Sequence, residues 1–139
     1  MDTLYTADAT STGGGRDGHV RSTDGFIDLD VAPPKEIGGR GGATNPEQLF
    51  AAGFAACFHS ALQAVARQAK VTIDGSSVTA AVDLGRDGEA FGLAVRLEAH
   101  LPGLDDDTAS ALLDGAHAVC PYSNATRGNI EVAVRRAEG

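Results

Sequence analysis

Two cysteines, Cys57 and Cys120, are the residues of this chain with the most readily defined chemistry. A free cysteine most often serves as a small buried apolar side chain, and Cys57, in the middle of an apolar segment, fits that role. Cys120 stands directly before Pro121 and a polar stretch, where a core role is less natural. If the segments that carry the two thiols pack together, one thiol can react with an oxidant and the other can close a disulfide with the product. The cysteines therefore predict either a redox-active pair or, for Cys57, a core side chain.

The same cysteines form a candidate metal set, because His59 and His117 stand close to them in the sequence. Two cysteines and two histidines make a common zinc site. His117 and Cys120, three residues apart, can share one helix face, but Cys57 and His59, two apart, point in different directions. The spacing argues against zinc, so both histidines are better interpreted as core-edge or surface residues.

Two charged residues, Arg16 and Glu47, have the right types to act on a thiol. Arg16 lies in a glycine-rich turn, STGGGRDG, and Glu47 lies near the start of a long apolar segment. Taken separately, Arg16 is a solvated loop charge and Glu47 is the acid of a capping box with Thr44. Taken together, a cation lowers the pKa of a buried thiol, and a carboxylate fixes the direction of that cation. These residues alone leave both interpretations open.

The segment that must position Cys57 runs from Thr44 to Lys70. Thr44 and Asn45 are N-cap residue types, and Pro46 suits the first helical position. Bulky apolar residues recur every three or four positions and alanine fills most of the others, so the helix is apolar on nearly all faces. The apolar run is shorter than the roughly 20 residues of a membrane span and is bounded by charged residues. We therefore predict a central buried helix.

The rest of the chain shows strand patterns and one further helix. Asp24-Gly25 and Arg86-Asp87-Gly88-Glu89 mark two hairpin turns. The order of elements predicts an α+β fold, with antiparallel β-sheets around the long central helix and a second, shorter helix. At this length we expect one domain, residues 1–139. Strands are expected over residues 4–10, 19–23, 26–31, 71–73, 77–84, 91–101 and 129–136, and the second helix over residues 109–119.

The composition excludes several classes of partner. The net charge is −8 and the acids are spread along the chain, which argues against nucleic acid and against anionic membranes. The first ten residues, MDTLYTADAT, contain no apolar segment of the signal-peptide kind. We therefore expect a cytoplasmic protein, in which two cysteines are more often redox-active or metal-binding than a permanent disulfide.

Three stretches together resemble a known family: GGGRDG around Arg16, TNPEQLFAAGFAACFHSAL around Glu47 and Cys57, and VCPYSNATRGN around Cys120. They are similar to the organic hydroperoxide resistance (Ohr) proteins of the Ohr/OsmC superfamily, and the similarity runs over nearly the whole chain. The resemblance implies an OsmC-like fold and an intertwined homodimer with active sites at the interface. It also implies a thiol-dependent peroxidase that needs no metal, flavin or haem.

The family's residue roles transfer by motif. Cys57 is then the peroxidatic thiolate, Cys120 resolves its sulfenic acid as a disulfide, and Arg16, held by Glu47, stabilises the thiolate. The implied substrates are organic hydroperoxides, including those of fatty acids, and the implied reductant is dihydrolipoamide or a lipoylated protein. Phe50, Phe54 and Phe58 lie along the helix that carries the thiol and suit an apolar substrate. The alternative is a non-enzymatic thiol redox sensor or a small-ligand-binding protein on the same fold.

The positions of Glu47 and Cys57 also bear on assembly. Ten residues of one helix separate them, which is about 15 Å of rise, so a glutamate side chain cannot bridge the distance. Either the helix begins after Glu47, or the Arg16–Glu47 pair beside a given Cys57 includes a residue from a partner chain. An apolar helix that one small domain cannot cover on all faces favours the partner chain.

Overall fold

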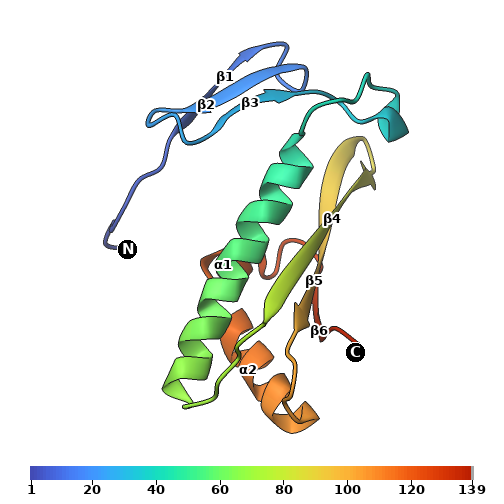
Figure 1. Ribbon diagram of the computed structural model, residues 1–139. Coiled ribbons are helices and arrows are strands. Elements are labelled where there is room, and N and C mark those ends of the chain that lie inside the picture. Colours follow the sequence, from blue (N-terminus) through green and yellow to red (C-terminus); the bar gives the residue numbers. More distant parts are fainter. Residues whose placement is uncertain (139) are drawn as a thin grey trace. The chain divides into compact units, whose positions relative to one another are not determined.

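The computed structural model describes residues 1–138, and the chain divides into two compact units, Met1–Leu49 and Phe50–Gly139. The first unit contains a three-stranded antiparallel sheet in the order β1-β2-β3 (Figure 1). Its strands are β1 (Ala9–Gly13), β2 (Gly18–Ser22) and β3 (Asp28–Val31), and a short 3-10 helix, η1 (Lys35–Ile37), follows them. The predicted hairpin is present between β2 and β3, but its turn is wider than the expected tight Asp24-Gly25 turn, because the N–H of Ser22 donates to the carbonyl of Ile27 at 2.8 Å and β3 begins only at Asp28.

The strand expected over residues 4–10 is displaced toward the C-terminus. The ladder of β1 starts where Ala9 pairs with Ser22, and residues 4–8 are not in a strand. The reason is the length of the partner, because β2 ends at Ser22 and the following turn offers no further backbone groups for pairing. The alternation read from residues 4–10 therefore lacked a partner strand over most of its length.

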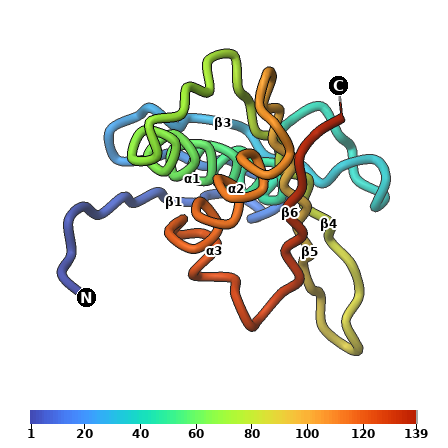
Figure 2. The backbone as a smooth tube through the Cα atoms, turned by 90° about the horizontal axis from the view of Figure 1, so that it is seen from below, coloured from blue at the N-terminus to red at the C-terminus, as the bar shows by residue number. Residues whose placement is uncertain are grey.

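The second unit packs helices against a three-stranded sheet in the order β4-β5-β6. The elements are α1 (Pro46–Gln68, of which the part from Phe50 belongs here), β4 (Ser77–Asp87), β5 (Ala90–His100), α2 (Asp106–Val119), α3 (Pro121–Thr126) and β6 (Val132–Arg136). Figure 2 shows α3 following α2 at a sharp corner, and α2 lies against β6. The predicted α+β class is confirmed, with the long helix and a second, shorter one in place.

Three details of the second unit differ from the expectation. The strand β6 pairs with β5 in parallel rather than antiparallel, because α2 and α3 form a crossover between them. The expected strand over residues 71–73 is not formed. A third helix, α3, begins at Pro121, since proline, which cannot continue α2, suits the first position of a new helix.

The long helix α1 buries one face. Its buried residues recur at helical spacing and join side chains of β5 and α2 in a single core. By length and composition α1 is apolar enough to cross a membrane, contrary to the expectation that its apolar run is too short, although a core helix can have the same length and composition. Only 28% of its most apolar stretch is buried, so the predicted central helix is buried on one face and not all round. The buried positions of α1 are Phe54, Phe58, Ala61, Leu62 and Ala66.

Candidate active site

The two cysteine thiols lie together in the second unit. The thiol of Cys120 points at Cys57 Sγ across 3.5 Å, and both cysteines are free. Cys57 is carried by the middle of α1 and is partly exposed, whereas Cys120 is fully buried. Cys120 ends α2 and begins α3, with an extended backbone (φ −64°, ψ 125°) that turns the chain between the helices. A disulfide can form here after a small movement, since bonded sulfurs lie about 2 Å apart.

The environment of Cys57 within this unit opposes ionisation. Burial raises the pKa of its thiol, and the neighbouring Cys120 raises it further. The backbone N–H of Tyr122 acts in the opposite direction and lowers the pKa. Neither Tyr122 nor Cys120 carries a positive charge, so a thiolate at Cys57 needs a cation from elsewhere.

The other two predicted residues, Arg16 and Glu47, are paired in the first unit. Arg16 Nη1 donates to Glu47 Oε2 at 2.9 Å and Nη2 donates to Oε1 at 2.7 Å, which is the two-pronged geometry that orients a guanidinium. Hydrogen bonding to Glu47 raises the pKa of Arg16, and the same bonds lower the pKa of Glu47, so both groups are charged at neutral pH. Because the side chain of Arg16 is still 45% exposed, it can reach a further anion.

The turn that presents Arg16 is fixed by its own backbone. The N–H of Gly14 donates to the carbonyl of Asp17 at 2.9 Å, and Gly18 admits no side chain, because a Cβ there would lie 2.1 Å from the carbonyl oxygen of Thr12. An ion pair between Arg40 and Asp17, 2.9 Å long, ties the turn to the loop before α1. The glycines of STGGGRDG thus shape a tight hairpin that holds one arginine outward.

The predicted capping box is wrong by one residue, and the difference explains why Glu47 is available. The N-cap of α1 is Asn45, whose Oδ1 accepts from the backbone N–H of Gln48 at 2.9 Å. The hydroxyl of Thr44 donates to the side chain of Gln48 at 2.8 Å. With the cap supplied by Asn45, the carboxylate of Glu47 is left to bind Arg16. The helix starts at Pro46, which excludes a start after Glu47.

An aromatic cluster lies beside Cys57, and one of its members was missed in the sequence. Tyr122 contacts Phe54 with ring centroids 5.5 Å apart and Phe50 at 6.1 Å, both edge-on. Gly53 makes this possible, since a Cβ there would lie 3.0 Å from the hydroxyl oxygen of Tyr122. Of the three predicted phenylalanines, Phe54 and Phe58 are fully buried and Phe50 is partly buried. The signal in the sequence that could have identified Tyr122 is its position two residues after Cys120.

The two histidines of the zinc alternative have other partners. His59 Nε2 lies 3.0 Å from Ser76 Oγ, and His117 Nδ1 lies 2.8 Å from Ser123 Oγ. Among residues 1–138, no group of three or more His, Cys, Asp or Glu side chains could hold a metal ion. The Cys57–Cys120 pair therefore stands with aromatic rather than metal-ligating neighbours.

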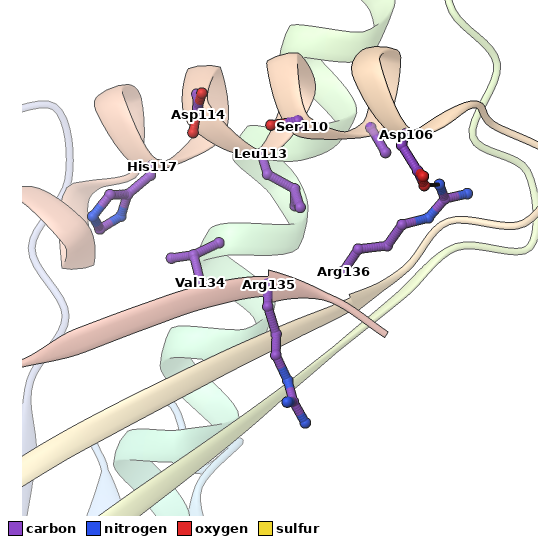
Figure 3. Close-up of a pocket in the computed structure, with 9 residues that line it drawn as sticks. Asp106, Ser110, Leu113, Asp114, His117, Val134, Arg135 and Arg136 are labelled. Atoms are coloured by element: carbon purple, nitrogen blue, oxygen red, sulfur yellow. Dashed lines mark hydrogen bonds and ion pairs between the residues drawn. The ribbon is translucent and has the colours of Figure 1, made fainter. Parts of the chain in front are cut away.

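A cavity of about 270 Å³ lies between α2 and β6 (Figure 3). His117 lies at one end of the row of α2 side chains in this view and Asp106 at the other. Asp106 is paired with Arg136 at 2.9 Å. The cavity is lined by Asp106, Ala109, Ser110, Leu113, Asp114, His117, Val134, Arg135 and Arg136, a set that does not include the two cysteines.

The fold and the paired thiols define a cysteine-bearing α+β protein of the OsmC type. The OsmC-like protein family matches residues 39–135. The chain is 51% identical over 136 residues to the organic hydroperoxide resistance protein of Xanthomonas axonopodis pv. citri, covering 96% of this chain and 95% of the relative. It therefore belongs to the organic hydroperoxide resistance proteins of the Ohr/OsmC superfamily.

Solved structures agree with this assignment. The organic hydroperoxide resistance protein OsmC of Legionella pneumophila superposes with a TM-score of 0.93 at 51% identity, covering 99% of this chain and 100% of that one. An organic hydroperoxide resistance protein from Elizabethkingia anophelis gives a TM-score of 0.94 at 49% identity, with both chains fully covered. The predicted family and fold are thus confirmed.

Proposed function

We propose that this protein is a thiol-dependent peroxidase that reduces organic hydroperoxides to alcohols. The observation that carries the proposal is the approach of two free thiols to 3.5 Å, one partly exposed and one buried, in a chain whose relatives are named for organic hydroperoxide resistance. The accessible thiol meets the substrate, and the buried thiol waits for the product.

The reaction takes three steps. The thiolate of Cys57 attacks one peroxide oxygen, the O–O bond breaks, and the organic fragment leaves as an alcohol after taking up a proton. Cys57 is then a sulfenic acid. Cys120 attacks the oxidised sulfur, water leaves, and the Cys57–Cys120 disulfide forms. A dithiol then reduces the disulfide and is itself oxidised to a cyclic disulfide, which returns both cysteines to thiols.

The Arg16–Glu47 pair supplies the positive charge that Cys57 lacks. Placed against the sulfur, the guanidinium favours the thiolate and can also donate a hydrogen bond to the peroxide. Glu47 fixes the plane of the guanidinium through two hydrogen bonds, so that the remaining N–H groups point in one direction. The pair acts as a unit, and either residue alone provides less.

The aromatic cluster favours substrates with an apolar part. Phe50 and Tyr122 keep part of their surface exposed and pack against each other and against the buried Phe54, and rings of this kind bind hydrocarbon better than water-like molecules. Alkyl, aryl and fatty-acid hydroperoxides are therefore the preferred class over hydrogen peroxide. Phe58 is a fully buried member of the core and supports the helix.

The reductant is a small dithiol of the dihydrolipoyl type, free or attached to a protein. Two thiols in a 1,3 arrangement on a short apolar chain match the aromatic residues near Cys57 and can close a five-membered ring as they reduce the disulfide. A reducing compartment such as the cytoplasm keeps both cysteines ready for the next cycle.

The active form is a homodimer in which the Arg16–Glu47 pair of one chain serves Cys57 of its partner. Ten residues of the continuous helix α1 separate Glu47 from Cys57, about 15 Å of rise, which no glutamate side chain spans. Much of the apolar surface of α1 is left uncovered, and Phe26 is 91% exposed and Leu4 98% exposed in the single chain. Such surface is typical of an obligate interface between copies.

Steady-state peroxide consumption tests the function. The purified protein is given dihydrolipoamide and either cumene hydroperoxide or hydrogen peroxide at equal concentration. Sustained turnover with a marked preference for cumene hydroperoxide supports the proposal. A single equivalent consumed without turnover would instead identify a redox sensor, and no consumption would overturn the proposal.

A further inference from the structure

The corner between α2 and α3 carries polar side chains that the proposed reaction does not use. Cys120 sits at this corner, so the direction of its thiol depends on the angle between the two helices. The helix α3 has six residues, which is too short to be stable by its own backbone hydrogen bonds. Its position must therefore come from contacts with the rest of the unit.

Two of those contacts end on one residue, His117. Ser123 is fully buried, and its hydroxyl lies 2.8 Å from His117 Nδ1. The guanidinium of Arg127 donates through Nη2 to the backbone carbonyl of His117 at 2.6 Å, and through Nη1 to Asn124 Oδ1 at 2.6 Å. The His117 clasp, made of His117, Ser123 and Arg127, thus joins the last turn of α2 to α3 and to the residue that follows it.

The clasp holds one group that the chemistry needs, the thiol of Cys120. Cys120, three residues after His117 and three before Ser123, lies between its arms, with its Sγ 3.5 Å from that of Cys57. Burial also lowers the pKa of His117, and nearby Arg127 lowers it further, so the imidazole is neutral at neutral pH.

We infer that His117 and Ser123 are positioning residues for the resolving step, which hold the buried thiol of Cys120 in line with the oxidised sulfur of Cys57. The inference rests on the proposed disulfide chemistry. In the resolving step Cys120 loses its proton, Cys57 loses hydroxide, and water and a disulfide form. When the clasp is open, a second peroxide reaches the sulfenic acid first, leaves as an alcohol, and converts Cys57 to the sulfinic acid.

The test compares four variants with the parent. Ser123→Ala and His117→Leu remove the hydrogen bond, while His117→Asn keeps a polar atom at the position of Nδ1 and should restore it. Ser110→Ala, an exposed residue of α2 that lines the cavity of Figure 3, is the matched control. Each protein receives one and then ten equivalents of cumene hydroperoxide, and the disulfide and sulfinic forms are counted by intact mass.

We expect Ser123→Ala and His117→Leu to form the disulfide ten- to about a hundredfold more slowly, as a displacement of the order of 1 Å would predict. Their sulfinic fraction should rise, while the rate of the first step, followed by alcohol release, should stay near that of the parent. His117→Asn and Ser110→Ala should resemble the parent. An equal decrease in the rates of the first and second steps, or no change in either rate, would overturn the inference.

A second arm separates this inference from the peroxidase proposal. Oxidised glutathione replaces the peroxide: a thiolate of the protein attacks one of its sulfurs and releases one glutathione, and the second cysteine then displaces the bound glutathione to give the internal disulfide. With the clasp intact the internal disulfide should dominate, and in Ser123→Ala and His117→Leu the mixed disulfide should persist. If the parent fails to consume peroxide but the variants still accumulate the mixed disulfide, the peroxidase proposal is contradicted and the inference about the clasp is supported. If the difference is absent, the clasp falls.

Discussion

The ion pair in Met1–Leu49 and the thiol pair in Phe50–Gly139 differ in charge and in exposure to solvent. Arg16 and Glu47 are both charged, and solvent still reaches the arginine. Cys57 and Cys120 lie among aromatic and aliphatic side chains, where burial raises the pKa of the Cys57 thiol. The Cys57 thiol is partly buried and lies close to a second thiol, but none of the groups that shift its pKa is positively charged. The Arg16–Glu47 pair is charged and oriented, but it contains no atom that can react with a peroxide. The proposed chemistry combines the two.

The largest effect should come from Cys57→Ser, which removes the reactive atom from the apolar region and leaves the ion pair intact. A serine hydroxyl does not ionise near neutral pH, so peroxide reduction should fall to the background rate. Cumene hydroperoxide consumption with dihydrolipoamide measures it. Appreciable turnover in this variant would show that the thiol region is not the reaction centre.

Cys120→Ser should separate the two thiols of the apolar region. The variant should still release one equivalent of alcohol, because Cys57 reacts first, but it cannot close the internal disulfide. Intact mass after peroxide treatment should show added oxygen on Cys57, where the parent shows the loss of two hydrogens. If the treated parent keeps both thiols free, Cys120 is not the resolving residue.

Arg16→Ala should show how much the apolar region depends on the charged one. Loss of a neighbouring cation raises a thiol pKa by about one to three units, and the thiolate fraction at neutral pH falls about tenfold for each unit. Alkylation of Cys57 should slow at pH 7 and recover at high pH. Arg21→Ala is the matched control, since Arg21 is an exposed cation of the same unit at 3.9 Å from Asp28. If the pH dependence of Cys57 alkylation is unchanged in Arg16→Ala, Arg16 is an ordinary solvated charge of the loop.

The smallest effect concerns the charged region alone. His19 Nδ1 lies 2.8 Å from Asp30 and Nε2 lies 2.5 Å from Asp28, and these bonds raise the pKa of His19. A raised pKa in the folded state adds stability that is complete below the unfolded value of about 6.5 and is lost as the pH rises through the folded value. His19→Asn should remove this slope from urea midpoints measured across that window. The same slope in both proteins would assign it to another group.

Much of the fold was predictable because its signals are local. The two hairpins, at Asp24-Gly25 and around Gly88, and the periodicity of α1 depend on neighbouring residues and are present, although the first turn is wider than expected. The direction of β6 was not predictable in this way, because parallel pairing results from the path of α2 and α3 between β5 and β6. The two roles of Pro121, which stops one helix and starts the next, also need the spatial path to be known.

The candidate site divides in the same manner. The types and motifs of Arg16, Glu47 and the two cysteines identify them in the sequence, since few other residues offer that chemistry. Tyr122 and Gly53 were missed because their link is a steric fit between α1 and α3, segments almost 70 residues apart, and no local pattern encodes it. The cap at Asn45 was misassigned because Thr44 and Asn45 are both N-cap types, and only backbone geometry chooses between them.

A hybrid dimer tests most directly whether the two regions act as one site across two chains. One chain carries Cys57→Ser and keeps the ion pair, and the other carries Arg16→Ala and keeps the thiols. If the pair of one chain serves the thiol of its partner, the hybrid contains one complete site, and we predict about half of the parent's activity per dimer. If the hybrid remains as weak as the Arg16→Ala homodimer, or if the protein is a monomer in solution, the account is contradicted.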